Sequence, residues 1–169
     1  MRRLVVGVMG AGEGASEKEL QDAFRLGELI AQEDWVLLSG GRNVGVMQQV
    51  NEGAKKHDKK SLTIGILPSA KAEVSEFVDV AIITDMGNAR NNINTLSSDV
   101  VIACGAGGAG TLSEIALALK NGKPVVLLSS EAITKQFFAR LNQGRLFFVD
   151  TAEAAIALIK EKIGVKKSS

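Results

Sequence analysis

The sequence predicts an α/β fold in a single domain, with a doubly wound, mostly parallel sheet covered by helices on both faces. First, short apolar runs alternate with helical patterns from one end of the chain to the other. Second, most of these runs are continuously apolar, as parallel strands buried on both faces require. Third, no linker rich in Pro or Ser, low-complexity tract or fixed repeat divides the 169 residues. We therefore expect one domain over residues 1–165, followed by a disordered tail over 166–169.

The apolar runs are the predicted strands of this sheet. In chain order they are Leu4–Met9, Trp35–Leu38, Leu62–Leu67, Val80–Ile83, Val100–Cys104, Val125–Leu128 and Leu146–Val149. If the chain crosses over so that Val100–Cys104 pairs beside Leu4–Met9, the turns after these two strands flank a topological switch point. Open α/β sheets bind their ligands at such a point. The sequence does not place Val80–Ile83 within the sheet.

Between the strands, the chain carries apolar residues at helical spacing. The predicted helices are Ser16–Gln32, Val44–His57, Asn88–Ser97, Thr111–Asn121 and Asp150–Ile163. Ser16 and Glu19 have the spacing of a capping box at the start of the first helix, and Asp150 and Glu153 have it at the start of the last.

The composition excludes several classes of protein. A formal net charge of +1 and few aromatic residues argue against a general nucleic-acid binder. No apolar run is long enough to span a membrane, and the N-terminus does not resemble a signal peptide. The single cysteine excludes an intrachain disulfide and a multi-cysteine metal site, which fits a cytoplasmic protein. We expect no metal site, no required cofactor, no nucleic-acid partner and no membrane contact.

The most informative stretch is Gly105–Glu114, a glycine-rich turn between a predicted strand and a predicted helix. Glycine lets the backbone approach a ligand closely, and the start of a helix presents free N–H groups and a partial positive charge to a phosphate. Two more glycine turns, Gly10–Gly14 and Ser39–Gly45, also follow strands. Together the three turns predict a site for a phosphorylated ligand. The residues expected to bind it are Gly10, Gly12, Ser39, Gly40, Gly41, Arg42, Gly45, Met47, Arg90, Asn91, Gly107, Gly108, Gly110, Thr111 and Glu114.

The turns do not fit two common nucleotide-binding motifs. The chain lacks the P-loop pattern G-x-x-x-x-G-K-[ST]. The first turn fails the spacing of the dinucleotide fingerprint, and Ser39 stands where an acidic residue would hold a ribose.

Glu114 and Arg90 each have two interpretations. Glu114 follows Thr111 by three residues, so it either closes a capping box or points its carboxylate into the site. Arg90 lies in a short helix rich in asparagine and is either a solvated surface residue or a clamp on an anion. In the second case, we expect removal of Arg90 to weaken binding with little effect on stability.

Three motifs resemble one superfamily. They are Ser-Gly-Gly-Arg-Asn-Val-Gly-Val-Met at 39–47, Ala-Arg-Asn-Asn at 89–92 and Gly-Gly-Ala-Gly-Thr-Leu-Ser-Glu at 107–114. They are similar to those of the Rossmann-like superfamily of LONELY GUY phosphoribohydrolases and molybdenum cofactor carrier proteins, many of which carry the label "lysine decarboxylase-like". The resemblance covers about residues 4–160.

The resemblance implies two functions. The hydrolases release the base of a nucleoside 5′-monophosphate, and their motif glutamate and arginine correspond to Glu114 and Arg90, which are catalytic only under this alternative. In this chain Ala106 replaces the family's proline and Asn91 replaces its lysine. The Ala-Arg-Asn form is closer to the carriers, which bind a phosphorylated pterin–molybdenum cofactor as cargo without transforming it.

The resemblance also implies a homo-oligomer, a dimer or a tetramer. Small helical residues such as Ala116 and Ala118 would allow close packing between copies.

Overall fold

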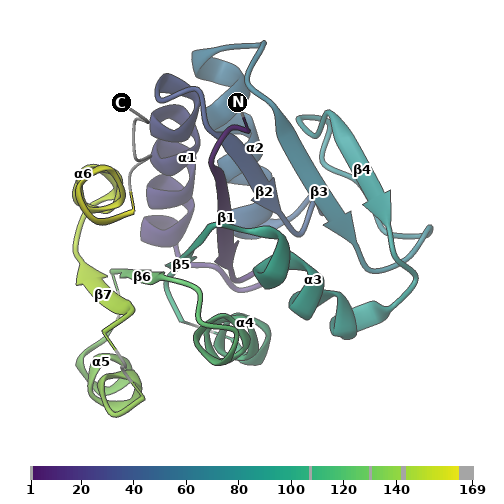
Figure 1. The fold of residues 1–169 in the computed structure, drawn as a ribbon. Helices are drawn as coiled ribbons and strands as arrows, with labels where there is room; N and C mark the ends of the chain where they lie inside the picture. The colour runs from purple at the N-terminus through teal and green to yellow at the C-terminus, as the bar shows by residue number, and fades with distance from the viewer. Residues whose placement is uncertain (1, 107, 130, 142–143, 164–169) are drawn as a thin grey trace.

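The computed structural model describes residues 2–106, 108–129, 131–141 and 144–163 (Figure 1). It contains a seven-stranded sheet with the order β4-β3-β2-β1-β5-β6-β7, in which every neighbouring pair is parallel. The strands are β1 (Val5–Gly10), β2 (Val36–Ser39), β3 (Thr63–Leu67), β4 (Val80–Ile83), β5 (Val100–Cys104), β6 (Val125–Leu128) and β7 (Leu146–Val149). The predicted α/β fold with one doubly wound domain is therefore confirmed.

Helices cover both faces of the sheet (Figure 1). They are α1 (Glu17–Gln32), α2 (Gly45–His57), α3 (Arg90–Ser97), α4 (Ala109–Lys120), α5 (Ala132–Ala139) and α6 (Ala152–Lys162), with a 3₁₀ turn η1 (Gly87–Ala89) before α3. The first core packs α1, α2 and α6 on one face of the sheet, and the second packs α4 and α5 on the other. Strand side chains alternate between these cores: Val100 belongs to the first core and Val101 to the second.

The predicted crossover is present. β1 pairs with β2 on one side and with β5 on the other, with Val6 opposite both Leu37 and Val100. The chain leaves β1 and β5 at the same edge of the sheet, so the glycine turns after these strands flank the switch point. β4, which the sequence did not place, is the parallel edge strand beside β3.

A capping box was predicted for both the first and the last helix, and only the first helix has it. Ser16 caps α1, and its capping box with Glu19 is complete, as predicted. The same prediction was wrong for α6, which begins at Ala152 after Thr151, whose hydroxyl accepts the Ala154 N–H at 3.1 Å. The carboxylates of Asp150 and Glu153 instead pair with Lys135 and Arg25.

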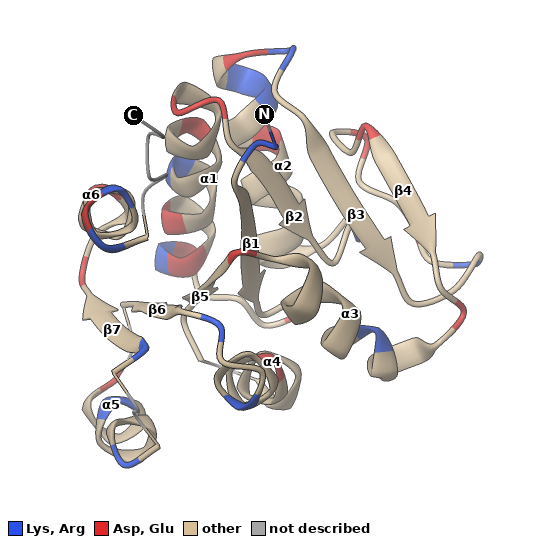
Figure 2. Cartoon of the chain, in the orientation of Figure 1, with Lys and Arg blue, Asp and Glu red and all other residues tan. Residues whose placement is uncertain are grey.

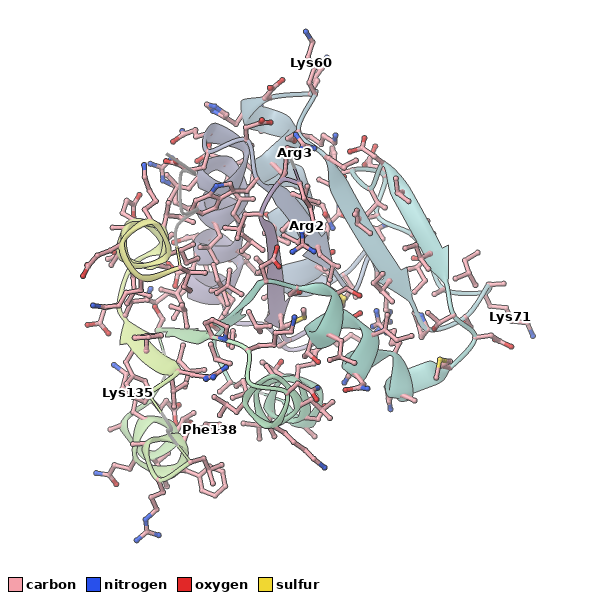
Figure 3. The ribbon with its side chains drawn as sticks, viewed as in Figure 1. Arg2, Arg3, Lys60, Lys71, Lys135 and Phe138 are labelled. Atoms are coloured by element: carbon pink, nitrogen blue, oxygen red, sulfur yellow. The ribbon has the colours of Figure 1, made fainter. Side chains whose placement is uncertain are left out.

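Helix α5 was not predicted. Its only buried residue is Phe138, labelled in Figure 3, whereas Ile133 and Phe137 are 72% and 62% exposed. The sequence of α5 therefore has no inward apolar stripe at helical spacing by which it could be recognised.

The described residues contain no helix long and apolar enough to cross a membrane. They also contain no group of three or more His, Cys, Asp or Glu side chains placed to hold a metal ion. The tail expected over 166–169 lies outside the described residues.

Candidate functional site

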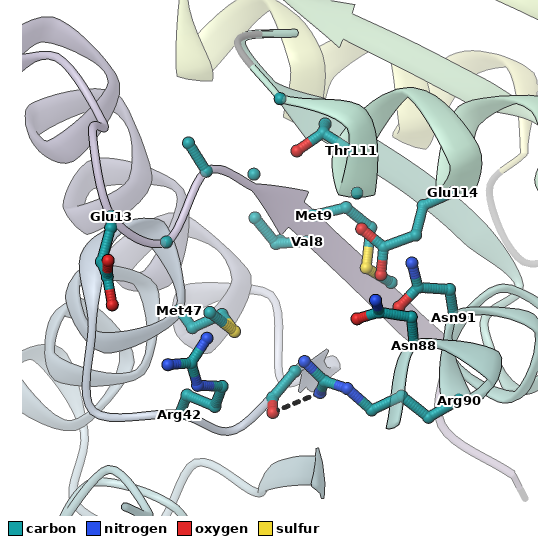
Figure 4. A pocket seen from close by; sticks show the side chains of 16 residues that line it. Val8, Met9, Glu13, Arg42, Met47, Asn88, Arg90, Asn91, Thr111 and Glu114 are labelled. Carbon is teal, nitrogen blue, oxygen red and sulfur yellow. Dashed lines mark hydrogen bonds between the residues drawn. The ribbon is translucent and has the colours of Figure 1, made fainter. Parts of the chain in front are cut away.

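A cavity of about 370 Å³ opens at the switch point, between the glycine turns and the starts of α3 and α4 (Figure 4). Most of the predicted binding residues line it. They are Gly10, Gly12, Gly40, Arg42, Met47, Arg90, Asn91, Gly108, Gly110, Thr111 and Glu114. Three others, Ser39, Gly41 and Gly45, do not, and Gly107 lies outside the described residues.

Ser39, Gly41 and Gly45, which do not line the cavity, fix the conformation of the second glycine turn. The buried Ser39 hydroxyl accepts hydrogen bonds from the Gly41 N–H at 3.1 Å and from Asn51 Nδ2 at 3.0 Å. Gly41 has a φ of +70°, and a Cβ there would lie 2.7 Å from Gly65 Cα. A Cβ on Gly45 would lie 2.1 Å from the Gly12 carbonyl oxygen, so the first turn packs directly on the start of α2. These residues hold the turn in place instead of facing a ligand.

The start of α4 is open to the cavity. Its N-cap, Gly108, has extended backbone and provides no side-chain cap, so the first amides of the helix have no intrahelical partner and no side-chain partner within the described part of the chain. A Cβ on Gly108 or Gly110 would meet nothing within 4 Å, so neither residue is closely packed against the rest of the described structure. Thr111 is buried in the first turn of the helix and lines the same cavity. The arrangement can bind an anion.

Arg90 begins α3 and is 9% exposed. Its Nη1 donates to the Gly40 carbonyl at 2.6 Å (dashed line in Figure 4) and to the Ile66 carbonyl, while its buried Nε has no partner among the described residues. Burial lowers the pKa of the guanidinium, the charge of Glu114 raises it, and that of Arg42 lowers it. The solvated-surface interpretation is thus wrong. These hydrogen bonds tie α3 to β3 and to the residue after β2, so we expect removal of Arg90 to lower stability, contrary to the expectation from the sequence.

Glu114 is 8% exposed and lies across the cavity from the first and second glycine turns, where Figure 4 places Glu13, Arg42 and Met47. Its Oε1 accepts a hydrogen bond from Asn94 Nδ2 at 2.9 Å. Burial raises the pKa of Glu114 to about 7, against the opposing effects of the Asn94 hydrogen bond and the Arg90 charge. The capping-box interpretation is wrong, because α4 begins at Ala109 and Thr111 already lies inside the helix.

A second asparagine amide, that of Asn91, joins α3 to α4. Asn91 Nδ2 donates to Ser113 Oγ at 2.9 Å, beside the Asn94–Glu114 contact. Asn91 and Asn94 therefore join α3 to α4, and Asn91 also lines the cavity.

Several lining residues were not predicted from the sequence. They are Val8, Met9, Ala11, Glu13 and Asn88. Val8 and Met9 lie near the end of β1, which leads to the switch point, and the others lie within the stretches already singled out. Their positions along the chain could have identified them, although their side-chain types carry no signal.

An open α/β sheet with a polar cavity formed by glycine turns at its switch point defines a Rossmann-like ligand-binding protein. The chain matches the SLOG cluster4 family model over residues 3–156 and belongs to that family, which agrees with the suspected superfamily.

Solved structures share this fold over nearly the whole chain. The molybdenum cofactor binding protein from Rippkaea orientalis is 56% identical, with a TM-score of 0.91 over 96% of this chain and 99% of that one. The molybdenum cofactor carrier protein of Chlamydomonas reinhardtii is 42% identical, with a TM-score of 0.90 over 97% of this chain and 100% of that one. An uncharacterized protein of Archaeoglobus fulgidus is 47% identical over 133 residues, which are 79% of this chain and 85% of the relative.

Proposed function

We propose that this protein binds a phosphorylated pterin–molybdenum cofactor as a carrier, with the phosphoryl group at the start of α4. The observation that carries the proposal is the uncapped first turn of α4, which faces a cavity of about 370 Å³ at the switch point. The similarity to two proteins described as binding or carrying molybdenum cofactor supports the choice of cargo.

The physical basis is the partial positive charge of the first helical turn. Around Gly108 and Gly110 the backbone carries no side chain that would keep a phosphoryl group away from the amides. The Thr111 hydroxyl lines the same space and adds a hydrogen-bond donor. The apolar residues in the lining, such as Met9 and Met47, suit contact with an organic ring system.

Binding without turnover fits the residues that differ from the hydrolase pattern. Asn91 stands where the hydrolases have lysine, and its amide is engaged with Ser113 at 2.9 Å. A neutral, already bonded amide cannot supply the charge that lysine would bring to a reacting group.

One observation favours the alternative, a nucleoside 5′-monophosphate phosphoribohydrolase. Glu114 is a buried carboxyl group in the cavity, and its pKa of about 7 is suited to proton transfer near neutral pH. In that function Glu114 would assist water or bind the ribose, and Arg90 would stabilise charge at the reacting end.

Mass spectrometry and metal analysis of the small molecule that co-purifies with the chain distinguish the two functions. The carrier proposal expects a phosphorylated pterin together with molybdenum. A bound nucleotide without molybdenum, combined with release of adenine from added AMP, would replace it with the hydrolase.

The expected dimer or tetramer remains a proposal, and the edge strand β4 supports it. Parallel strands are normally covered on both faces, yet Val80, Ile82 and Ile83 are 44%, 44% and 55% exposed. β4 also carries no charged residue that would discourage pairing with another strand (Figure 2). Ala118 does not contribute, because it is buried against the sheet of its own chain.

A further inference from the structure

We propose that the cavity takes a ligand with two anionic groups, the first at the start of α4 and the second at Arg42 on the opposite wall. This inference deepens the proposed function and rests on it for the α4 position only. The ligand class is a phosphate ester whose far end carries a second anionic group, such as a carboxylate, a phosphate or a metal oxo group.

Backbone hydrogen bonds on both sides of Arg42 hold its main chain in place. Arg42 pairs with Val74 in an isolated antiparallel bridge. On either side of it, the Asn43 N–H donates to the Glu73 carbonyl and the Ser75 N–H to the Gly41 carbonyl, each at 2.9 Å. The turn therefore presents Arg42 to the cavity from a rigid base.

The Arg42 side chain has no hydrogen-bond or ion-pair partner among the described residues. It lines the cavity and is half-buried, yet no other group in residues 2–106, 108–129, 131–141 and 144–163 forms a hydrogen bond or ion pair with its guanidinium. Glu13 also lines the cavity but does not pair with Arg42. A half-buried guanidinium with five free donors is suited to bind an oxyanion.

A second guanidinium group, that of Arg90, lies near Arg42. Arg90 lines the same cavity, and its Nε is buried without a partner among the described residues. The charge of Arg42 lowers the pKa of Arg90, so the two guanidinium groups repel one another. An anion held by Arg42 would relieve this repulsion.

The start of α4 and the Arg42 side chain are separate positions in the cavity. Figure 4 shows Thr111 and Arg42 on opposite sides of the cavity, with the side chains of Val8 and Met9 between them. One small anion would occupy only one position, whereas an organic phosphate with a second anionic end can reach both.

Crystals of the whole chain soaked in molybdate test this inference, because the anomalous signal of molybdenum locates each bound anion. We expect one molybdate at Gly108–Thr111 and another within hydrogen-bonding distance of Arg42. Arg42→Gln should remove only the second, and Gly108→Asp should remove only the first. A molybdate at α4 alone contradicts this inference and leaves the proposed function standing. A molybdate at Arg42 alone contradicts both.

Solution binding provides the matching measurement. Fructose 1,6-bisphosphate should bind wild-type protein about tenfold or more tightly than fructose 6-phosphate, because a second charged hydrogen bond is formed. In Arg42→Gln the two affinities should become equal. Equal affinities in the wild-type protein, or a preference that survives in Arg42→Gln, would overturn the inference.

Discussion

Asn94 of α3 holds the carboxylate of Glu114 of α4 inside the cavity, with its Nδ2 2.9 Å from Oε1. Asn94 is fully buried and Glu114 is 8% exposed, so this contact places a titratable group in the part of the molecule proposed to bind the cargo. The behaviour of that group with pH is open to direct measurement.

The raised pKa of Glu114 should make stability fall between about pH 4.5 and about pH 7. The folded state binds the proton more tightly than the unfolded chain, where the ordinary pKa is 4.5. The stabilisation is therefore fully present below pH 4.5 and is lost as the pH rises through about 7. Urea denaturation across this range should show a steeper decline for wild-type protein than for Glu114→Gln, which cannot ionise. Parallel curves for the two proteins would show that Glu114 has an ordinary pKa.

Wild-type protein should release little or no adenine from AMP. Asn91 and Ala106 break the hydrolase pattern, and the Asn91 amide is bonded to Ser113. Chromatographic detection of free base is the measurement. Brisk release in wild-type protein that falls by about 10²-fold or more in Glu114→Gln would establish the hydrolase instead.

Arg90→Ala should lower the free energy of unfolding by about 1–3 kcal/mol, because the Gly40 and Ile66 carbonyls lose a buried charged donor. Arg42→Ala is the matched control, since its guanidinium is not bonded to other described residues. That variant should stay within about 0.5 kcal/mol of wild type. Equal stability of both variants in urea would argue that the Arg90 contacts do not support the fold.

A charge on β4 should dissociate the proposed oligomer. Ile82→Lys places an ammonium group in the middle of the exposed edge strand, where a second copy would bury it. Ile133→Lys on α5 is the control, because Ile133 is also exposed but lies away from β4. Light scattering should give an oligomer for wild type and for Ile133→Lys, and a smaller mass for Ile82→Lys. A monomeric wild-type protein would refute the proposal.

Much of the fold was predictable because its central strands, such as β2, β5 and β6, are buried on both faces. Runs such as Val100–Cys104 are continuously apolar, and their order along the chain restricts the crossovers to a few arrangements. The position of β4 was not predictable, since an edge strand has the same apolar sequence as a central one. Helix α5 was not predictable either, because its apolar residues Ile133 and Phe137 are exposed and Phe138 alone is buried.

The site was predictable in location and less so in detail. Glycine turns after strands mark the place where a ligand can approach the backbone, and the cavity lies there. Which glycines face the ligand depends on tertiary contacts. Gly45 lies against the Gly12 carbonyl, and Gly41 against Gly65. The predicted start of α4, Thr111, was wrong. The helix begins at Ala109, after the extended backbone of Gly108, and no capping side chain marks that position in the sequence.

The central claim is that the start of α4 binds the phosphoryl group of a molybdenum cofactor, and substitutions of Gly108 test it most directly. Gly108→Asp places a carboxylate at the anion position while capping the helix, so the variant should remain folded. Gly108→Ala adds only a methyl group, which meets nothing within 4 Å. The measurement is the molybdenum and pterin retained per chain after purification from cells supplied with molybdate. We expect retention in wild type and Gly108→Ala and its loss in Gly108→Asp. Equal retention in Gly108→Asp, or none in the wild-type protein, would contradict the account.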